Sequence, residues 1–505
     1  MSRRIKKLLI ANRGEIALRI LRAARDAGIR TVAAVSEIDK EAAFAVQADE
    51  CVILGPAAPA ESYLCIERLL TVAQEVSADA VHPGYGFLSE NAEFAEAVEQ
   101  AGILFVGPTP ATIRSLGDKA AARALAVKAS VPIAPGSEAS DCSQTLAAII
   151  EKIGLPILLK PAAGGGGKGM QVIEEGADVL AAIEGAQRIA KAAFGDTRLI
   201  AEKLIRPARH VEIQIFGDGA GSVVALGERE CSLQRRHQKI LEETPSMVVD
   251  EALRARMSDA AISLGKSCDY RGAGTVEFLL DENQKFYFLE VNTRLQVEHP
   301  VTEEVYGVDL VRAQFAVAEG RGIPQALQSC EPRGHAIEVR ISAEDAEAGF
   351  LPSPGPLLAC QVPEGPGIRW DAGFEGAGAI SPEYDPMIAK LIVWGADRKQ
   401  AIERLSRALH ETQILGLTTN IGYLTMIAES DWFAAGAFHT QTIEELPRIL
   451  LTKNIPDAVV AAAAWMWTHS HKSASNSTPN SAEGGSPADP FETLGAWRAN
   501  RGGVS

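Results

Sequence analysis

Six side chains with acid, base or ligand chemistry lie within the eleven residues EVNTRLQVEHP, which directly follow the apolar run FYFL. They are Glu290, Asn292, Arg294, Gln296, Glu298 and His299. Charged groups at the end of a buried strand cost free energy unless they are paired or bind a ligand. The spacing therefore predicts a functional site where this strand ends.

A metal site requires that this strand pairs with the one before it. The runs GTVEFLL and KFYFLEVN are separated by DENQ, so a two- or four-residue loop would place Glu277 roughly opposite Phe288. On that register Glu277, Glu290 and Asn292 share one face, and their oxygens suit Mg²⁺. A loop of three or five residues would overturn this arrangement. The alternative is a pair of edge carboxylates exposed to water.

A glycine-rich segment, PILLKPAAGGGGKGM, follows another predicted strand. Consecutive glycines allow backbone N–H groups to close over phosphate oxygens. The segment is not a Walker A motif, because Gly169 follows Lys168. Lys160 ends the preceding strand, and Lys119 follows SLGD at the predicted start of a helix. Together they would neutralise a triphosphate, although each alone fits an ordinary surface lysine.

The segment ERECSLQRRHQK is a candidate anion pocket. Its cationic and polar residues are Gln234, Arg235, Arg236, His237 and Lys239. A solvated basic face is the alternative. We interpret Cys231 within it as a packing residue rather than a nucleophile.

The elements that hold these residues fall into three predicted regions and a tail. Residues 1–117 alternate strand and helix, which indicates a parallel α/β sheet. Residues 118–330 mix strands and helices as an α+β region, and residues 331–450 form a third region. Residues 451–505 comprise a helical segment and then a Ser/Pro-rich linker and tail, too poor in apolar residues to fold alone.

Bulk composition narrows the class of protein. A chain of 505 residues exceeds a single hydrophobic core, and a net charge of −16 argues against nucleic acid and anionic membranes as partners. Any anionic ligand must therefore meet a local basic patch. The seven cysteines show no CxxC pair, which indicates reduced thiols in the cytoplasm. The longest apolar run, AVVAAAAWMW, is too short to span a membrane, and no targeting segment is evident.

Five segments together closely resemble the biotin carboxylases: IANRGEIALRI, HPGYGFLSEN, GGGGKGM, ECSLQRRHQK and EVNTRLQVEHPVTE. The last is highly specific to these carboxylases and their carbamoyl-phosphate relatives. The resemblance covers about residues 4–450. It implies a Rossmann-like N-terminal domain, an ATP-grasp domain with a small lid at about residues 135–205, and a β-rich C-terminal domain.

The resemblance also implies a role for each matching residue. The phosphate contacts would be Lys119, Lys160, Gly166 and Gly167. The hinge that reads adenine would be Glu202, Lys203 and Leu204, and the rest of the nucleotide site His210, Gln234 and His237. Glu277, Glu290 and Asn292 would bind Mg²⁺ or Mn²⁺. The bicarbonate cradle would be Lys239, Arg294, Gln296 and the backbone of Val297. Glu298 would be the general base, and Arg340 would meet the ureido oxygen of biotin.

The implied reaction is the ATP- and bicarbonate-dependent carboxylation of biotin N1′ through carboxyphosphate, with Lys239, Arg294, Glu298 and Arg340 as catalytic residues. The implied partners are a biotin carboxyl carrier protein or domain, a carboxyltransferase subunit and a second copy of the chain. No Met in this chain is followed by Lys, so the AMKM-like biotinylation turn is absent. We therefore expect biotin on a separate carrier.

The tail and two rival functions stay open at this stage. The segment DPFETLGAWRANR resembles the start of the region that joins biotin carboxylase to its carrier in acyl-CoA carboxylase α subunits, and an unstructured tail is the alternative. The rival functions are another ATP-grasp ligase that joins a carboxylate to an amine, and a nucleotide-binding subunit without turnover. The final carboxyl acceptor is not encoded in these motifs.

Overall fold

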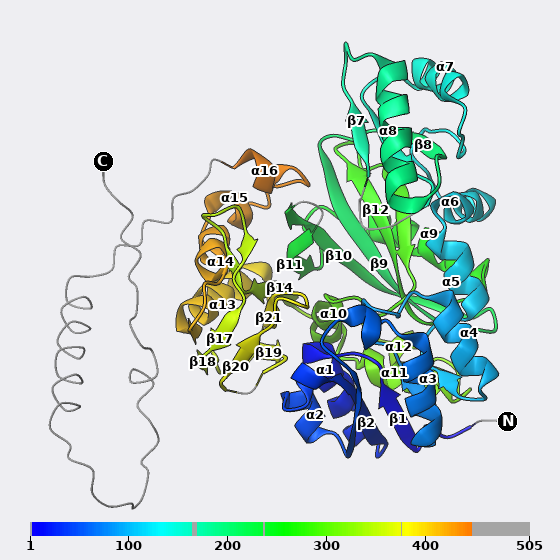
Figure 1. Ribbon diagram of the computed structural model, residues 1–505. Coiled ribbons are helices and arrows are strands. Elements are labelled where there is room, and N and C mark those ends of the chain that lie inside the picture. Colours follow the sequence, from blue (N-terminus) through cyan, green and yellow to red (C-terminus); the bar gives the residue numbers. More distant parts are fainter. Residues whose placement is uncertain (1–2, 164–168, 236–237, 375, 447–505) are drawn as a thin grey trace, which may run out of the picture.

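The structure is a computed structural model and describes residues 3–163, 169–235, 238–374 and 376–446. The N-terminal region contains a parallel sheet of order β3-β2-β1-β4-β5 with helices packed on it, which confirms the predicted α/β alternation (Figure 1). Its strands are β1 (Lys7–Ile10), β2 (Arg30–Ser36), β3 (Glu50–Gly55), β4 (Ala80–His82) and β5 (Leu104–Phe105). Its helices are α1 (Gly14–Asp26), η1 (Glu37–Asp39), α2 (Ala43–Gln47), η2 (Pro59–Glu61), α3 (Ile66–Glu75), α4 (Ala92–Gln100) and α5 (Pro110–Gly117).

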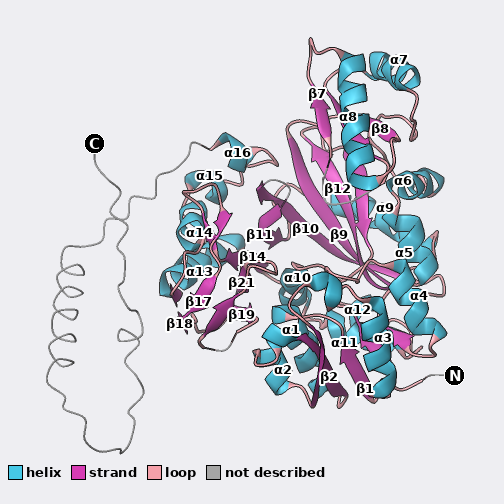
Figure 2. Ribbon diagram, in the orientation of Figure 1, coloured by secondary structure: helices cyan, strands magenta, loops and turns pink. Residues whose placement is uncertain are grey.

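A small lid of helices and strands projects from the centre of the molecule (Figures 1 and 2). Its sheet has the order β7-β6-β8 and is covered by two helices through an apolar cluster of its own. The elements are α6 (Lys119–Lys128), which leads into the lid, and α7 (Ser143–Ile153), β6 (Ile157–Pro161), β7 (Gln171–Ile173), α8 (Val179–Phe194) and β8 (Leu199–Lys203). Asp118 caps α6 by accepting a hydrogen bond from the backbone of Ala121, so Lys119 begins a helix as predicted.

One eight-stranded sheet forms the centre of the molecule and continues into the C-terminal region. Its order is β13-β12-β9-β10-β11-β14-β21-β19, and its neighbouring strands pair antiparallel. The strands are β9 (Ala208–Asp218), β10 (Val223–Arg235), β11 (Gln238–Thr244), β12 (Arg271–Asp281), β13 (Phe286–Asn292), β14 (His335–Ser342), β19 (Ile368–Ala372) and β21 (Met387–Gly395). The pairing of β11 with β14 therefore crosses the predicted boundary at residue 330.

The two faces of this sheet carry different side chains because residues alternate along each strand. On β9, Val211, Ile213 and Ile215 pack against helix α9 (Glu251–Lys266). On β14, Ile337 and Val339 pack in the cluster that includes helix α13 (Arg398–Glu411). We call this side the core face. The opposite side, the site face, carries the polar phase of the same strands and meets α10 (His299–Tyr306).

The remaining elements complete the packing. They are α11 (Leu310–Ala318), α12 (Gln325–Gln328), β15 (Glu344–Asp345), β16 (Leu351–Pro352), β17 (Gly355–Leu357), β18 (Ala359–Gln361), β20 (Gly378–Ile380), β22 (Gln413–Leu415), α14 (Ile421–Ala428), α15 (Asp431–Ala434) and α16 (Thr442–Glu445). The short strands make the C-terminal region rich in β structure, as expected (Figure 2). No helix among the described residues has the length and apolarity needed to cross a bilayer.

Candidate active site

A row of carboxylates crosses three neighbouring strands on the site face. Glu212 on β9 lies opposite Glu277 on β12, and Glu277 lies opposite Glu290 on β13. Directly opposed residues of antiparallel strands project to the same face, so the three acidic groups lie side by side. Asn292 follows on that face, and its Nδ2 donates to Glu277 Oε1 at 2.8 Å. The predicted hairpin and its shared face for Glu277, Glu290 and Asn292 are confirmed.

The predicted pairing of Glu277 with Phe288 is wrong. The hairpin loop has three residues, closed by a hydrogen bond from the Asp281 N–H to the Lys285 carbonyl at 2.9 Å. Alone, this loop would turn Glu277 and Glu290 to opposite faces. The strand pair changes register between Glu277 and Phe278, which leaves Leu289 as an extra, bulged residue on β13. The bulge cancels the effect of the loop and restores the shared face.

Lys239 links this row to Glu298. Its Nζ lies 2.5 Å from Glu212 Oε2, 2.9 Å from Glu277 Oε1 and 2.5 Å from Glu298 Oε1. Burial lowers the pKa of Lys239, but the three carboxylates outweigh burial and hold its pKa well above the ordinary value. Lys239 is therefore a buried cation at the centre of an anionic cluster.

Glu298 lies between Lys239 and Arg340. Arg340 Nη2 donates to Glu298 Oε2 at 2.9 Å, and Arg340 Nε donates to Glu242 Oε1 at 2.7 Å. Burial raises the pKa of Glu298, yet the cations Lys239, Arg340 and Arg229 lower it well below its ordinary range. The carboxylate is therefore ionised and can accept a proton.

A second β-bulge, on β11, turns two of its side chains toward this cluster. Leu233 pairs with Leu241 and Gln234 pairs with Lys239, so Ile240 is an extra residue on β11. Ile240 and Leu241 both lie in the core-face cluster. As a result Lys239 and Glu242, three residues apart, both face the site.

Arg294 is fixed by partners from two regions of the chain. Its Nε donates to Glu90 Oε2 at 2.9 Å, its Nη1 to Gln296 Oε1 at 2.8 Å, and its Nη2 to Asn292 Oδ1 at 3.1 Å. Glu90 also accepts from the Thr293 N–H at 3.0 Å. Glu90 is not among the predicted site residues, although it lies in the segment HPGYGFLSEN that carries the resemblance.

The predicted phosphate and hinge residues gather at the junction of the central region and the lid. Lys160 bonds Glu202, which also accepts from Arg123 Nη1 at 3.0 Å. Burial lowers the pKa of Lys119, and Glu290, Lys160 and Glu202 act on it electrostatically. The lysine is therefore near both the carboxylate row and the lid.

The last two hinge residues are held within the lid. Lys203 Nζ donates to the carbonyls of Gly154 and Leu155 at 3.1 and 2.6 Å. The Leu204 N–H donates to the Pro156 carbonyl at 3.2 Å. The side chain of Lys203 therefore points into the lid, and its backbone N–H donates to the Pro135 carbonyl at 2.7 Å.

His210 and Gln234 join the carboxylate row. Gln234 Nε2 lies 2.7 Å from His210 Nδ1, and His210 Nε2 lies 3.2 Å from Glu277 Oε2. Arg235 leaves the predicted anion pocket, since its guanidinium stacks on Phe350 at 4.5 Å and pairs with Glu344 at 3.0 Å. Three other predicted residues and one cation of the basic run lie outside the described residues: Gly166, Gly167, His237 and Arg236.

The carboxylate row fits a divalent cation on the chemistry of its donors. Burial and the charge of Glu277 raise the pKa of Glu290, whose side chain makes no hydrogen bond or ion pair within the described residues. A nearby set, His210, Glu212 and Glu277, brings three ligand atoms within 4.8 Å of one another. Oxygen-rich sites with excess negative charge suit Mg²⁺ or Mn²⁺.

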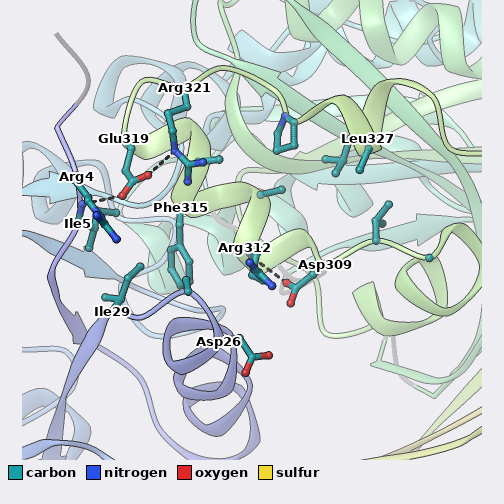
Figure 3. Close-up of a pocket in the computed structure, with 17 residues that line it drawn as sticks. Arg4, Ile5, Asp26, Ile29, Asp309, Arg312, Phe315, Glu319, Arg321 and Leu327 are labelled. Atoms are coloured by element: carbon teal, nitrogen blue, oxygen red, sulfur yellow. Dashed lines mark hydrogen bonds and ion pairs between the residues drawn. The ribbon is translucent and has the colours of Figure 1, made fainter.

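A cavity of about 720 Å³ lies elsewhere, between α1 and α11 (Figure 3). Two of its charged groups form an ion pair, with Arg321 Nε donating to Glu319 Oε2 at 2.6 Å. Glu319 Oε1 also accepts from the Ile5 N–H at 2.8 Å. No predicted site residue lines this cavity, so volume alone does not identify the reactive centre.

Three successive segments of the chain match models of known families. Residues 4–113 match the biotin carboxylase N-terminal domain, and residues 338–445 match the biotin carboxylase C-terminal domain. Residues 118–326 match the ATP binding domain of the carbamoyl-phosphate synthase L chain.

Individual relatives extend this agreement. A biotin carboxylase from Nostoc is 47% identical over 441 residues, covering 87% of this chain and 99% of the relative. The mitochondrial methylcrotonoyl-CoA carboxylase subunit alpha of Dictyostelium discoideum is 43% identical over 98% of this chain and 71% of the relative. The biotin carboxylase domain dimer of Hydrogenobacter thermophilus 2-oxoglutarate carboxylase, solved with MgADP, ADP and bicarbonate, superposes with a TM-score of 0.84 at 41% identity and covers 88% of this chain and 98% of that one. This chain belongs to the biotin carboxylase family.

Proposed function

We propose that this chain carries out the first half-reaction of a biotin-dependent carboxylase, in which ATP activates bicarbonate and the carboxyl group passes to N1′ of biotin. The observation that carries this proposal is the position of Glu298. It is a buried carboxylate held between two cations, Lys239 and Arg340, beside a row of acidic side chains. Glu298 thus lies beside Lys239, which would bind bicarbonate, and beside Arg340, which would bind biotin.

The phosphate side of the site would bind ATP. Lys119 and Lys160 place two positive charges near the lid, where they would neutralise triphosphate oxygens. Mg²⁺ or Mn²⁺, when bound by Glu277, Glu290 and Asn292, supplies positive charge to the phosphate oxygens. Lys119 and Lys160 would also orient the nucleotide, and His210 and Gln234 would line the nucleotide site.

Bicarbonate would lie between Lys239 and Arg294. Arg294 is pre-set by Glu90 and Gln296, so its planar group is oriented before the substrate arrives. Glu298 takes the bicarbonate proton while a bicarbonate oxygen attacks the γ-phosphorus and ADP leaves. The product is carboxyphosphate, which breaks into CO₂ and phosphate.

The biotin step would use Arg340. The released phosphate removes the N1′ proton of biotin, N1′ attacks CO₂, and Arg340 stabilises the negative ureido oxygen. Two of the three cations that hold Glu298 ionised, Lys239 and Arg340, would also bind bicarbonate and biotin. Each substrate therefore draws one cation partly away from Glu298 and strengthens it as a base.

Bicarbonate-dependent ATP cleavage tests this assignment. We expect the purified chain with Mg²⁺ to hydrolyse ATP only when bicarbonate is present, and free biotin to raise the rate. ATP cleavage that depends on an added carboxylate and amine but not on bicarbonate would favour the carboxylate-amine ligase. No cleavage under any of these conditions would favour a nucleotide-binding subunit.

The carrier and carboxyltransferase partners are part of this proposal. Relatives named as methylcrotonoyl-CoA carboxylase subunits support an acyl-CoA carboxylase, and the dimer named for the solved relative supports a homodimer. We propose that biotin arrives on a separate carrier, with residues 447–505, which lie outside the described residues, as a segment that docks it. A streptavidin blot of the chain coexpressed with a biotin ligase should be negative, and a positive band would refute the separate carrier.

Cellular location and domain boundaries also belong to this proposal. We propose a cytoplasmic enzyme, which fractionation of the source cells would test. We further propose domains at residues 1–117, 118–330 with a lid at about 135–205, and 331–450. Limited proteolysis that cuts first near these boundaries would support them.

A further inference from the structure

A fully buried lysine lies beside the proposed bicarbonate site but on a different region of the chain. Lys390 on β21 has a side chain that is 0% exposed. Its Nζ donates to the Val297 carbonyl at 2.8 Å and lies 3.1 Å from Glu15 Oε1 on α1. The ammonium group thus joins the N-terminal region, the loop after β13 and the C-terminal region. A lysine is rarely this buried unless its charge is paired.

The surroundings keep Lys390 charged. Burial lowers its pKa and Arg369 opposes the charge, but Glu15, Glu338 and Asp371 outweigh both and raise the pKa above the ordinary value. Asp371 also forms an ion pair with Arg369, in which Arg369 Nη2 lies 2.8 Å from Asp371 Oδ2.

Glu15 in turn is tied to the segment HPGYGFLSEN. Burial raises the pKa of Glu15 to about 7 despite Lys390, and the hydroxyl of Tyr85 donates to its Oε1. The position of Lys390 is therefore set by groups from both flanking regions.

Two consecutive carbonyls of residues 293–298, which we call the bicarbonate loop, are held by buried side chains. Lys390 holds the Val297 carbonyl, and His299 Nδ1 lies 2.7 Å from the Gln296 carbonyl. Burial and the cations Lys390, Arg19 and Arg369 keep the pKa of His299 well below its usual range. A neutral His299 with its proton on Nδ1 donates to Gln296.

Fixing these carbonyls fixes the backbone donors of the loop. A peptide unit is planar, so the direction of the Gln296 carbonyl sets that of the Val297 N–H. In the same way the Val297 carbonyl sets the direction of the Glu298 N–H. These amides lie between Gln296 of the proposed cradle and Glu298, the proposed base.

We infer that Lys390 is a positioning residue that holds the peptide Val297–Glu298 from the C-terminal region, so that this region completes the bicarbonate site. The inference rests on the proposed function of that site. It predicts that loss of the ammonium group impairs the use of bicarbonate much more than the binding of ATP, because Lys390 contacts none of the predicted nucleotide residues among the described residues.

The test compares Lys390→Met, which keeps most of the side-chain length, with Lys399→Met in the same region, where the side chain is 88% exposed. We expect Lys390→Met to lower kcat/KM for bicarbonate by about 10- to 100-fold. The KM for ATP should change less than about twofold, and Lys399→Met should behave as wild type.

Stability is controlled with a double variant. Lys390→Met leaves Glu15 without its cation, whereas Lys390→Met/Glu15→Gln removes the unpaired charge as well. The double variant should recover melting temperature but not bicarbonate kinetics. Recovery of both would show that Lys390 acts only on stability, which overturns the inference.

Hydrogen exchange gives a readout that does not require turnover. Amides of residues 296–301 should exchange at least tenfold faster in both Lys390 variants, while those of β9 keep the wild-type rate. Unchanged exchange in this loop would overturn the inference. Absence of bicarbonate-dependent ATP cleavage in the wild type would instead overturn the proposed function, so the two failures are distinguishable.

Discussion

Buried carboxylates on the two faces of the large sheet differ in how completely they are paired, as two adjacent glutamates on β11 show. Glu243 on the core face accepts from Arg398 at 2.7 and 3.2 Å and lies 2.7 Å from His335 Nε2, so both of its oxygens are satisfied. Glu242 on the site face accepts from Arg340 through Oε1, while its buried Oε2 has no hydrogen-bond partner among the described residues.

The pKa values follow this difference. Burial raises the pKa of Glu243, but His335 and Arg398 outweigh burial and lower it. Burial and repulsion from Glu298 raise the pKa of Glu242 to about 7, since the positive charge of Arg340 offsets them only in part. The core face uses charge to hold elements together. The site face leaves charge incompletely paired, which stores electrostatic free energy that substrates can release on binding.

Glu298→Gln gives the largest expected effect and tests the site face. Loss of the base should reduce bicarbonate-dependent turnover by about two to four orders of magnitude. Folding and ATP binding should change little, as judged by thermal melting and nucleotide titration. Turnover close to that of the wild type would sink the assignment of Glu298 as the base.

Glu243→Gln is the matched change on the core face. Removing one partner of a buried ion pair costs about 3 kcal/mol or more, so the melting temperature should fall clearly. Turnover per folded molecule should stay within about twofold, measured with enzyme quantified by active-site titration. A selective loss of kcat without destabilisation would break the contrast between the faces.

Glu290→Ala should sharpen the contrast through the metal. We expect a weaker Mg²⁺ response, by about tenfold or more in the concentration for half-maximal rate, and slower phosphoryl transfer. The metal-free variant should melt at or above the wild-type temperature, because repulsion with Glu277 is removed. An unfolded variant whose surviving activity keeps its Mg²⁺ dependence would show that Glu290 is structural.

Glu242→Gln gives the smallest effect, read from pH dependence. The folded pKa of about 7 exceeds the ordinary value of 4.5, so the stability tied to the protonated acid is present below 4.5 and lost as pH rises through 7. The melting temperature of the variant relative to wild type should therefore increase by a few degrees between pH 5 and pH 8. A difference that stays constant or falls over this window would contradict the raised pKa.

Sequence patterns predicted the elements of the site better than its register. The α/β alternation, the hairpin and the helix start at Lys119 follow from local periodicity and turn residues, and the structure confirms them. The bulges at Leu289 and Ile240 were not predicted, because an apolar run gives no sign of which residue is extra.

The sequence patterns also did not predict residues that reach the site from distant parts of the chain or from a strand phase that normally faces water. Glu212 occupies the polar phase of HVEIQIF, a phase that normally predicts exposure, yet it is fully buried. Glu90 and Lys390 reach the site from regions distant in sequence, so no local pattern marks them.

The sheet that continues from β11 into β14 limits how the chain can be divided. A fragment ending near residue 330 would lack β14 and leave the edge of β11 without its hydrogen-bonding partner. Open edges of this kind join other chains, and proteins normally cover them. The C-terminal region therefore acts as a cap against aggregation. Efforts to exchange regions between carboxylases should keep β11 and β14 from the same parent.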